Sequence, residues 1–143
     1  MFPSVDEIVE DMANDDVPLR PSMLFHLSGL GPRELRSFSE KWLRVGFAPR
    51  RQILGCLVQM AEENFEVDFN SIFRHSLGDP DAQVRALAID GLWEVREVSL
   101  LERLLDLLEG DPSELVRARA AIALGRFALL SELGKLGESC GPR

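Results

Sequence analysis

One segment occurs twice in this chain, and it limits the fold more than any other feature of the sequence. The stretch "LGDPDAQVRALAIDGLWEV" covers residues 77–95, and "EGDPSELVRARAAIALGRFA" covers residues 109–128. In both copies Asp-Pro comes first, Val-Arg follows, and Ala and Leu then recur at the spacing of one helix face. Recurrence at a fixed period is typical of a structural unit that stacks on its own copy. The repeat therefore predicts two similar helical units in succession.

The positions that the two copies share have structural reasons to be conserved between them. They are Asp79, Pro80, Val84 and Arg85 in the first copy and Asp111, Pro112, Val116 and Arg117 in the second. Each aspartate precedes a helix start, where a carboxylate can cap free backbone N–H groups. Proline stiffens the turn, and valine anchors the helix in the core. Because the arginine recurs at the structural period, we expect it to bridge to an aspartate or carbonyl of the adjacent repeat; anion binding is the alternative.

The rest of the chain is also patterned for helices, and no segment alternates with the period of a strand. Ser4 and Glu7 form a capping box, and Pro32 and Pro49 each stand at a first helical position. The fold class is therefore predicted to be all-α, in a single domain. The helix pairs are predicted at about 4–29, 32–65, 68–96 and 98–130, with a flexible C-terminal tail at 131–143.

Two of the predicted helices have buried faces that bear on the site. The helix after Asp79 is expected to continue to Val95 and to turn Val84, Ala88 and Leu92 toward the core. The buried stripe of the helix before Asp111 is expected to be Leu101, Leu104, Leu105 and Leu108. The helix that opens at Pro49 is apolar on more than one side, so we expect it to be central and buried.

Charge argues against a nucleic-acid partner. The 143 residues carry a net charge of −8, with 45% hydrophobic and 28% charged residues, which is typical of a globular protein. An acidic chain repels phosphate unless it concentrates basic residues on one face. The candidates for such a face are Trp42, Arg44, Arg50 and Arg51, although neighbouring glutamates dilute it.

The sequence predicts a cytoplasmic protein without a membrane anchor. The longest apolar runs are far shorter than a membrane span. The acidic N-terminus has neither the basic start nor the apolar core of an export signal. Cys56 and Cys140 have no metal-binding or redox spacing, and two unpaired cysteines fit a reducing compartment.

Motifs that carry chemistry are missing from the sequence. The two histidines, His26 and His75, have no spacing typical of metal ligands. No serine or cysteine stands in a nucleophile elbow, and the glycines form no phosphate-binding loop. We therefore expect no catalytic residues, no cofactor and no metal, while a site assembled in space from other residues stays open.

A helix pair of about thirty residues with "DPxxxVRxxAxxAL" opening its second helix resembles the HEAT repeat, in particular the short bacterial repeats named after phycobilisome lyases. The resemblance is strong over residues 68–130, moderate over 32–65 and weak over 4–29. It implies an α-solenoid with outer helices on a convex face and inner helices on a concave face that commonly receives partners. The resemblance predicts the fold but almost nothing about catalytic activity or ligands, because such repeats serve many functions.

The resemblance implies first a non-enzymatic scaffold or adaptor that binds another protein on its concave face. The alternative class is a HEAT-like enzyme or nucleic-acid binder, of the bilin-lyase or alkylpurine-glycosylase type. A third interpretation is a fragment of a longer solenoid, since no further helix is predicted to cover Leu129, Leu130 and Leu133. The same uncapped end makes a homodimer possible.

The predicted partner-binding site lies where the two copies differ. Asp90, Trp93 and Glu94 align with Ile122, Gly125 and Arg126. If the helix turns its valine and alanine inward, Asp90 and Glu94 project outward and Trp93 is half exposed. An aromatic side chain in such a setting is typical of binding surfaces, although it can also fill the groove between repeats. We predict partner contacts from Asp90, Trp93, Glu94 and Arg126.

Overall fold

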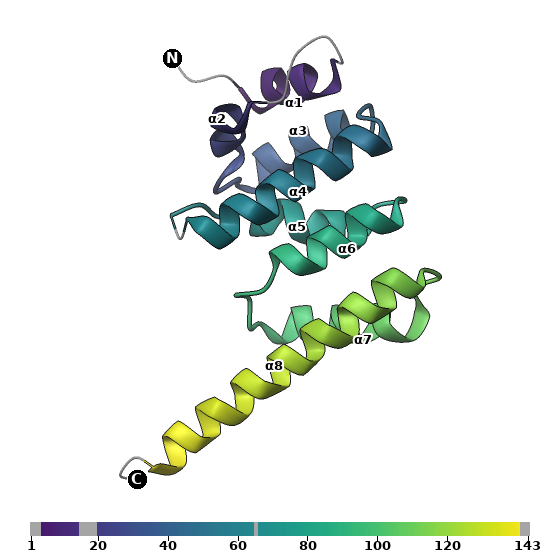
Figure 1. Ribbon diagram of the computed structural model, residues 1–143. Helices are drawn as coiled ribbons and strands as arrows, with labels where there is room; N and C mark the ends of the chain where they lie inside the picture. The colour runs from purple at the N-terminus through teal and green to yellow at the C-terminus, as the bar shows by residue number, and fades with distance from the viewer. Residues whose placement is uncertain (1–3, 15–19, 65, 141–143) are drawn as a thin grey trace. The chain divides into compact units, whose positions relative to one another are not determined.

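The computed structural model describes residues 4–14, 20–64 and 66–140, with the backbone alone for Pro21 and residues 130–140. Every regular element within these ranges is a helix, which confirms the all-α prediction for this part of the chain (Figure 1). The chain divides into two compact units, Met1–Leu92 and Trp93–Arg143. Each unit has its own architecture.

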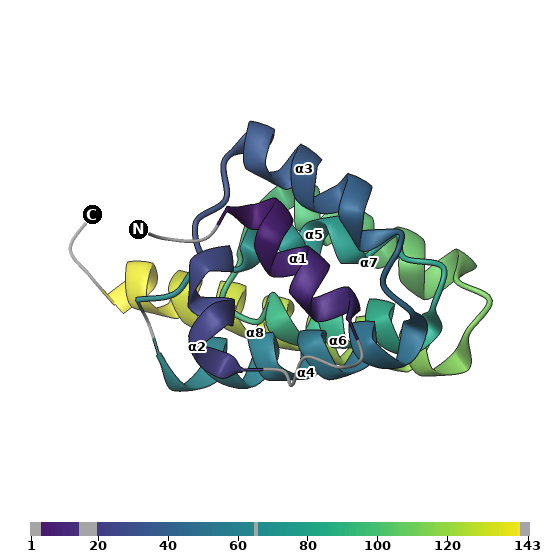
Figure 2. The same ribbon diagram turned by 90° about the horizontal axis from the view of Figure 1, so that it is seen from above.

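The first unit consists of successive helix pairs stacked in two layers. Its elements are α1 (Val5–Ala13), α2 (Pro21–Leu24), the 3-10 helix η1 (Phe25–Leu27), α3 (Pro32–Trp42), α4 (Phe47–Glu63), α5 (Asn70–Ser76) and α6 (Ala82–Gly91). Helix α3 contacts both α1 and α5, and α4 contacts α6, so odd- and even-numbered helices form separate layers (Figure 2). This is how the repeats of an α-solenoid stack.

Local signals in the sequence account for the helix starts in this unit. The Ser4 hydroxyl accepts a hydrogen bond from the Glu7 N–H at 3.2 Å and caps α1 as predicted. Pro32 opens α3, also as predicted. Helix α4 begins at Phe47 rather than at Pro49. The proline is accommodated because the N–H that it lacks would lie in the first turn, where no intrahelical partner exists.

The core of the first unit is aromatic at its centre. Phe38 and Trp42 stack with ring centroids 4.9 Å apart, and Phe69 packs edge-on against Phe73. All four rings are buried. Helix α4 buries Ile53, Leu54, Leu57 and Val58. These four residues lie on one side of the helix, and Gln52, Gln59 and Glu63 on the opposite side are exposed, so α4 buries one face instead of being buried on more than one side as the sequence suggested.

Helix α6 ends at Gly91, earlier than predicted. Val84, Ala88 and Leu92 are buried as expected, but residues 92–94 form a turn instead of continuing the helix to Val95. An added Cβ on Gly91 would lie 2.6 Å from ring atoms of Phe73, so glycine lets α5 and α6 approach closely. Glycine also weakens a helix at that point. Trp93 therefore belongs to a turn.

The second unit is an antiparallel pair of helices, α7 (Val98–Gly110) and α8 (Glu114–Cys140) (Figure 1). The buried residues of α7 are Leu100, Leu104 and Leu107. The predicted stripe was wrong except at Leu104, since Leu105 is 41% exposed and Leu101 and Leu108 are half-buried. Leucine occupies so many positions of α7 that its spacing fits two overlapping faces, and packing selects one of them.

Helix α8 is longer than the sequence suggested. Its backbone is helical through Cys140, over most of the segment 131–143 that we expected to be a flexible tail. Gly134 and Gly137 lie within the helix. A single glycine costs a helix only about 1 kcal/mol relative to alanine, and the surrounding Leu, Glu and Lys residues are good helix formers. Residues 141–143 lie outside the described part of the chain.

Candidate functional site

The two aspartates of the repeated motif organise the turn before a helix, but they are not its N-caps. Asp79 Oδ1 accepts from the N–H of Asp81 at 2.9 Å, and Asp111 Oδ1 accepts from the N–H of Ser113 at 2.8 Å. Asp81 and Ser113 are the caps, each accepting from the N–H three residues further on, at 3.1 and 3.4 Å. The predicted role was therefore wrong, because each motif aspartate forms a turn that positions the cap.

The motif arginines bind carbonyl groups of their own turn. Arg85 Nη1 donates to the carbonyl oxygens of Asp79 and Pro80, at 2.8 and 3.1 Å. Arg117 Nη1 donates to the carbonyl oxygen of Asp111 at 2.7 Å. These acceptors lie in the same repeat as the arginine. A bridge from the arginine to the adjacent repeat stays a prediction. The recurring arginine thus closes the turn on which its own helix begins.

Ion pairs from Arg50 and Arg51 of α4 join successive repeats of the first unit. Nη1 of Arg50 lies 3.2 and 3.1 Å from the two carboxylate oxygens of Asp79. Arg51 donates to the carboxylate of Asp81 at 2.9 and 2.6 Å. The hydrogen bond from Arg51 is the main reason that the pKa of Asp81 is lowered from its ordinary value. Both arginines thus form ion pairs with aspartates of the next repeat.

This pairing removes much of the small basic patch suggested by the sequence. Arg50 is only 3% exposed, and Trp42 is 1% exposed. The Arg50 guanidinium also lies over the Trp42 ring, 5.8 Å from its centroid. A nucleic-acid surface needs accessible cations and aromatic faces, which these two side chains do not provide.

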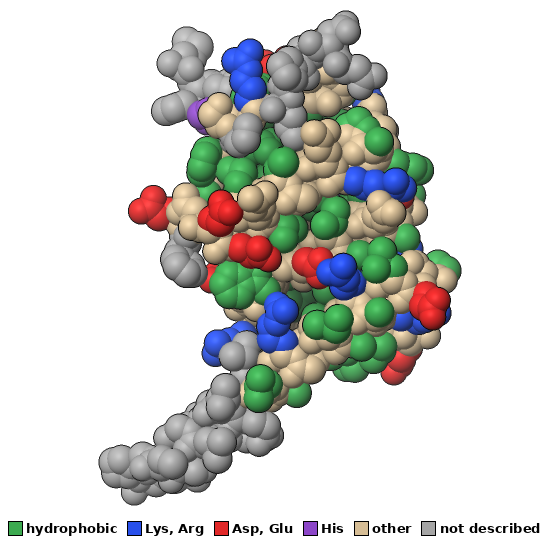
Figure 3. Space-filling model, in the orientation of Figure 1, with side chains coloured by type: hydrophobic (Ala, Val, Ile, Leu, Met, Phe, Trp, Pro, Cys, Tyr) green, Lys and Arg blue, Asp and Glu red, His purple; other side chains and the backbone are tan. Residues whose placement is uncertain are grey.

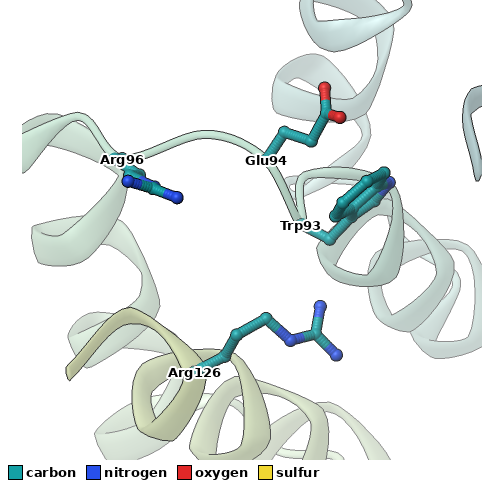
Figure 4. Close-up of a pocket in the computed structure, with 4 residues that line it drawn as sticks. All are labelled: Trp93, Glu94, Arg96 and Arg126. Carbon is teal, nitrogen blue, oxygen red and sulfur yellow. The ribbon is translucent and has the colours of Figure 1, made fainter. Parts of the chain in front are cut away.

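A hollow of about 670 Å³ opens on the second unit (Figure 4). It is lined by Trp93, Glu94, Arg96 and Arg126. The first three come from the segment that precedes α7, and Arg126 comes from α8. All four lining residues belong to the second unit, so the hollow is a feature of that unit alone.

The hollow combines an aromatic face with two cationic groups. Arg96 and Arg126 lie at its edge on different segments, the guanidinium of Arg126 is directed toward Trp93, and the carboxylate of Glu94 points away from both guanidinium groups (Figure 4). Trp93 is half-buried, whereas the other three lining residues are exposed. Among the described residues, neither arginine forms an ion pair. Their charges therefore face solvent and can attract an anionic group.

The structure brings together three of the four predicted partner-binding residues. Trp93, Glu94 and Arg126 line one hollow, although they come from different segments. Asp90 does not line it; it is a half-buried residue of α6, in the first unit, and has an interaction of its own. That these residues bind a partner stays a prediction.

Sequence reasoning missed Arg96. The residue that aligns with it in the second copy of the repeat is Ala128, so a difference between the copies was visible here too. The helical period of the sequence predicts Trp93 and Glu94 on a helix, and the predicted site extends only to Glu94 in the first copy. Because α6 ends early, the chain bends after Trp93, and Arg96 reaches the same hollow.

Little else in the described residues suggests chemistry. No group of three or more His, Cys, Asp and Glu side chains in that part of the chain is arranged to hold a metal ion. His75 lies with Nδ1 3.5 Å from the Ser39 hydroxyl and edge-on to Phe38, and partial burial lowers its pKa. These are the contacts of a histidine at the edge of a core. No described helix is long and apolar enough to cross a bilayer.

Comparison with known families and structures gives one match. Residues 71–139 match the family model of HEAT repeats. The matched segment contains both copies of the Asp-Pro motif, which confirms the resemblance to HEAT repeats over this part of the chain. No curated protein and no solved structure matches the chain.

Proposed function

Because this chain belongs to the HEAT-repeat family, we propose that it is a non-enzymatic scaffold or adaptor that binds another protein. The observation that carries the proposal is the hollow lined by Trp93, Glu94, Arg96 and Arg126. Trp93, Glu94 and Arg96 each align with a residue of different chemistry in the second copy of the repeat. Arg126 likewise aligns with a residue of different chemistry, Glu94, in the first copy. The shared motif residues build the turns, which leaves the divergent residues available for recognition.

The composition of the hollow supports a protein partner. Tryptophan and arginine are the side chains that most often contribute large binding energies at protein interfaces. Here the indole of Trp93 is partly accessible, and Arg96 and Arg126 have no ion-pair partner among the described residues. Binding would bury the indole and pair the cations, which is how a small site can stabilise a complex.

A nucleic-acid binder has less support. The chain is acidic, with a net charge of −8, and Arg50 and Arg51 are paired with aspartates. We also propose a site in the cytoplasm, which fits an adaptor role, because Cys56 is a free thiol. We propose no catalytic step. The Ser39 hydroxyl lies 3.5 Å from Nδ1 of His75, but it donates to the carbonyl oxygen of Leu35 at 2.8 Å, so this contact does not activate it as a nucleophile.

Affinity capture with matched variants tests the proposal. The full chain is immobilised, and bound proteins are compared between the wild type, Trp93→Ala and Arg126→Ala. Phe25→Ala is the control, because Phe25 is an aromatic residue 46% exposed on the first unit. We expect the partner to be retained by the wild type and the control and to be lost by both site variants. Arg126→Ala keeps the test valid if Trp93→Ala unfolds.

Thermal unfolding of each variant is measured alongside. Arg126 is exposed, so its substitution should leave the unfolding temperature close to that of the wild type. If the site variants capture the same proteins as the control, or if binding is lost only together with folding, the site is wrong. Shifts of labelled DNA at low salt would favour the nucleic-acid alternative instead.

A further inference from the structure

One exposed face of α8 has the pattern of a helix that packs against another helix. Its residues are Leu115, Ala118, Ile122, Gly125 and Leu129, here called the α8 seam. They alternate at spacings of three and four, as the contact positions of paired helices do. All five are exposed, and Ile122 and Leu129 are each 60% exposed. Among the described residues of the second unit, no element covers this apolar face.

Two large residues of the seam stand where the other repeats have polar residues. Leu115 and Ile122 align with Gln83 and Asp90 of α6. They align in turn with Gln52 and Gln59 of α4, both of which are exposed. At these positions the earlier repeats present polar groups, and the last described repeat presents large apolar ones. A change confined to one repeat at an exposed position points to binding, because core packing does not require it.

Two small residues allow a partner to approach the seam closely. Ala118 and Gly125 lie between the large residues, and nothing lies within 4 Å of the position that a Cβ on Gly125 would occupy. A facing helix could thus place side chains into the spaces between Leu115, Ile122 and Leu129. This arrangement suits a helix that lies along α8.

The charges beside the seam determine the chemistry of the partner. Residues 115–129 contain Arg117, Arg119 and Arg126 and no acidic residue, in a chain whose net charge is −8. Arg119 and Arg126 are each four residues after a large seam residue, on the same side of it. Arg126 also lines the hollow with Arg96, so the hollow adjoins the seam. Hydrophobic and basic side chains lie together along this face of α8 (Figure 3).

From this complementarity we infer that the partner contributes an acidic amphipathic α-helix. Its apolar side lies along the α8 seam, and its carboxylates pair with Arg126 and Arg96 beside the indole of Trp93. The inference rests on the proposed function and specifies the partner of the same site. An acidic helix is favoured over nucleic acid because the seam is apolar and phosphate backbones offer nothing to cover it.

Designed peptides test the chemistry directly. One fluorescein-labelled helical peptide of about three heptads has Leu at its contact positions and Glu at the flanking positions; a second has Lys in place of Glu. Binding to the full chain is followed by fluorescence anisotropy. We expect the Glu peptide to bind about tenfold more tightly than the Lys peptide, with a preference that weakens as salt is added.

Charge reversal makes the test specific. Arg126→Glu should invert the preference toward the Lys peptide, and Ile122→Glu should abolish binding of the Glu peptide. Arg103→Glu is the matched control, with the same charge change at an exposed position of α7 that does not line the hollow. It should leave the preference for the Glu peptide intact. Unfolding curves identify any variant that fails to fold.

Four results would overturn the inference. They are equal or absent binding of the two peptides, an unchanged preference in Arg126→Glu, binding of a labelled DNA duplex that Arg126→Glu abolishes, and a homodimer in light scattering that Ile122→Glu dissociates. The last would assign the seam to a second copy of this chain. Capture of a partner through Trp93 without binding of the Glu peptide would leave the proposed function standing and remove only the inference.

Discussion

Arg50 of α4 and Asp79 of the turn before α6 form a buried ion pair. One guanidinium nitrogen of Arg50 lies 3.2 and 3.1 Å from the two carboxylate oxygens of Asp79, and the other donates to the carbonyl oxygen of Trp42 at 3.0 Å. Both charged side chains are only 4% exposed. The pair therefore joins successive repeats where solvent does not screen the charges.

Removal of Asp79 should destabilise the fold strongly. In Asp79→Ala the buried charge of Arg50 loses its partner, which typically costs about 3–5 kcal/mol. Urea unfolding measures the loss. The control is Glu10→Ala, which removes a 3.1 Å pair with Lys41 whose side chains are 25% and 60% exposed, and should cost less than about 1 kcal/mol. Equal costs for the two variants would show that Asp79 does not hold a desolvated charge.

The second pair between repeats should give stability a dependence on acid. The pKa of Asp81 is lowered chiefly by the hydrogen bond from Arg51, so the folded protein binds this proton less readily than the unfolded chain does. The resulting stability is present above the ordinary aspartate pKa of about 3.9 and is lost as the pH falls through the lower folded pKa.

Unfolding measured at several pH values checks this dependence. The stability difference between the wild type and Asp81→Asn should be largest near neutral pH and should shrink below about pH 4. In an Arg51→Gln background the same substitution should have a smaller effect that varies less with pH. A difference that grows on acidification would contradict the sign of the shift.

Gly91 should not tolerate a methyl group. Its added Cβ would lie 2.6 Å from the ring of Phe73, which is fully buried and has little room to move. Gly91→Ala should therefore cost about 1–3 kcal/mol, despite the better helix propensity of alanine. The matched variant is Gly55→Ala in α4, where nothing lies within 4 Å of the added atom. It should be neutral or stabilising in the same denaturation experiment.

The motif arginines should contribute to stability in unequal measure. Arg85 is 9% exposed and donates to two carbonyl groups, whereas Arg117 is half-buried and donates to the Asp111 carbonyl. Arg85→Met should cost about 1.5–3 kcal/mol, since hydrogen bonds from charged groups have this strength. Arg117→Met should cost less. If neither variant is destabilised but a bound anion is lost, the arginines bind ligand instead.

Much of the fold follows from patterns within single segments. The helical period of the apolar residues, the capping serine at position 4 and the proline at position 32 act over a few neighbouring residues. Such signals need no knowledge of the rest of the chain. The valine anchors at 84 and 116 also follow from the pattern, and both are fully buried.

Other features depend on which partner each segment meets. Leucines of α7 fit two faces equally well, and contact with α8 buries Leu100, Leu104 and Leu107. Asp79 and Asp81 are two carboxylates close in sequence, and either could accept hydrogen bonds from an arginine or from the first turn of α6. Packing decided that Asp79 pairs with Arg50 and that Asp81 caps α6. Spacing does not distinguish these outcomes, because the competing arrangements have the same local geometry.

The sequence by itself determined that this protein is built from repeated helix pairs, and it indicated that recognition lies where the copies differ. Helical period and repeat period are local properties, so they can be read from one chain. Only the tertiary structure decided that α6 ends at Gly91, against the ring of Phe73, and so placed Trp93 in a turn. The same bend brought Arg96 to the hollow with Arg126, because a side chain's neighbours are set by the contacts that remain once the core is packed.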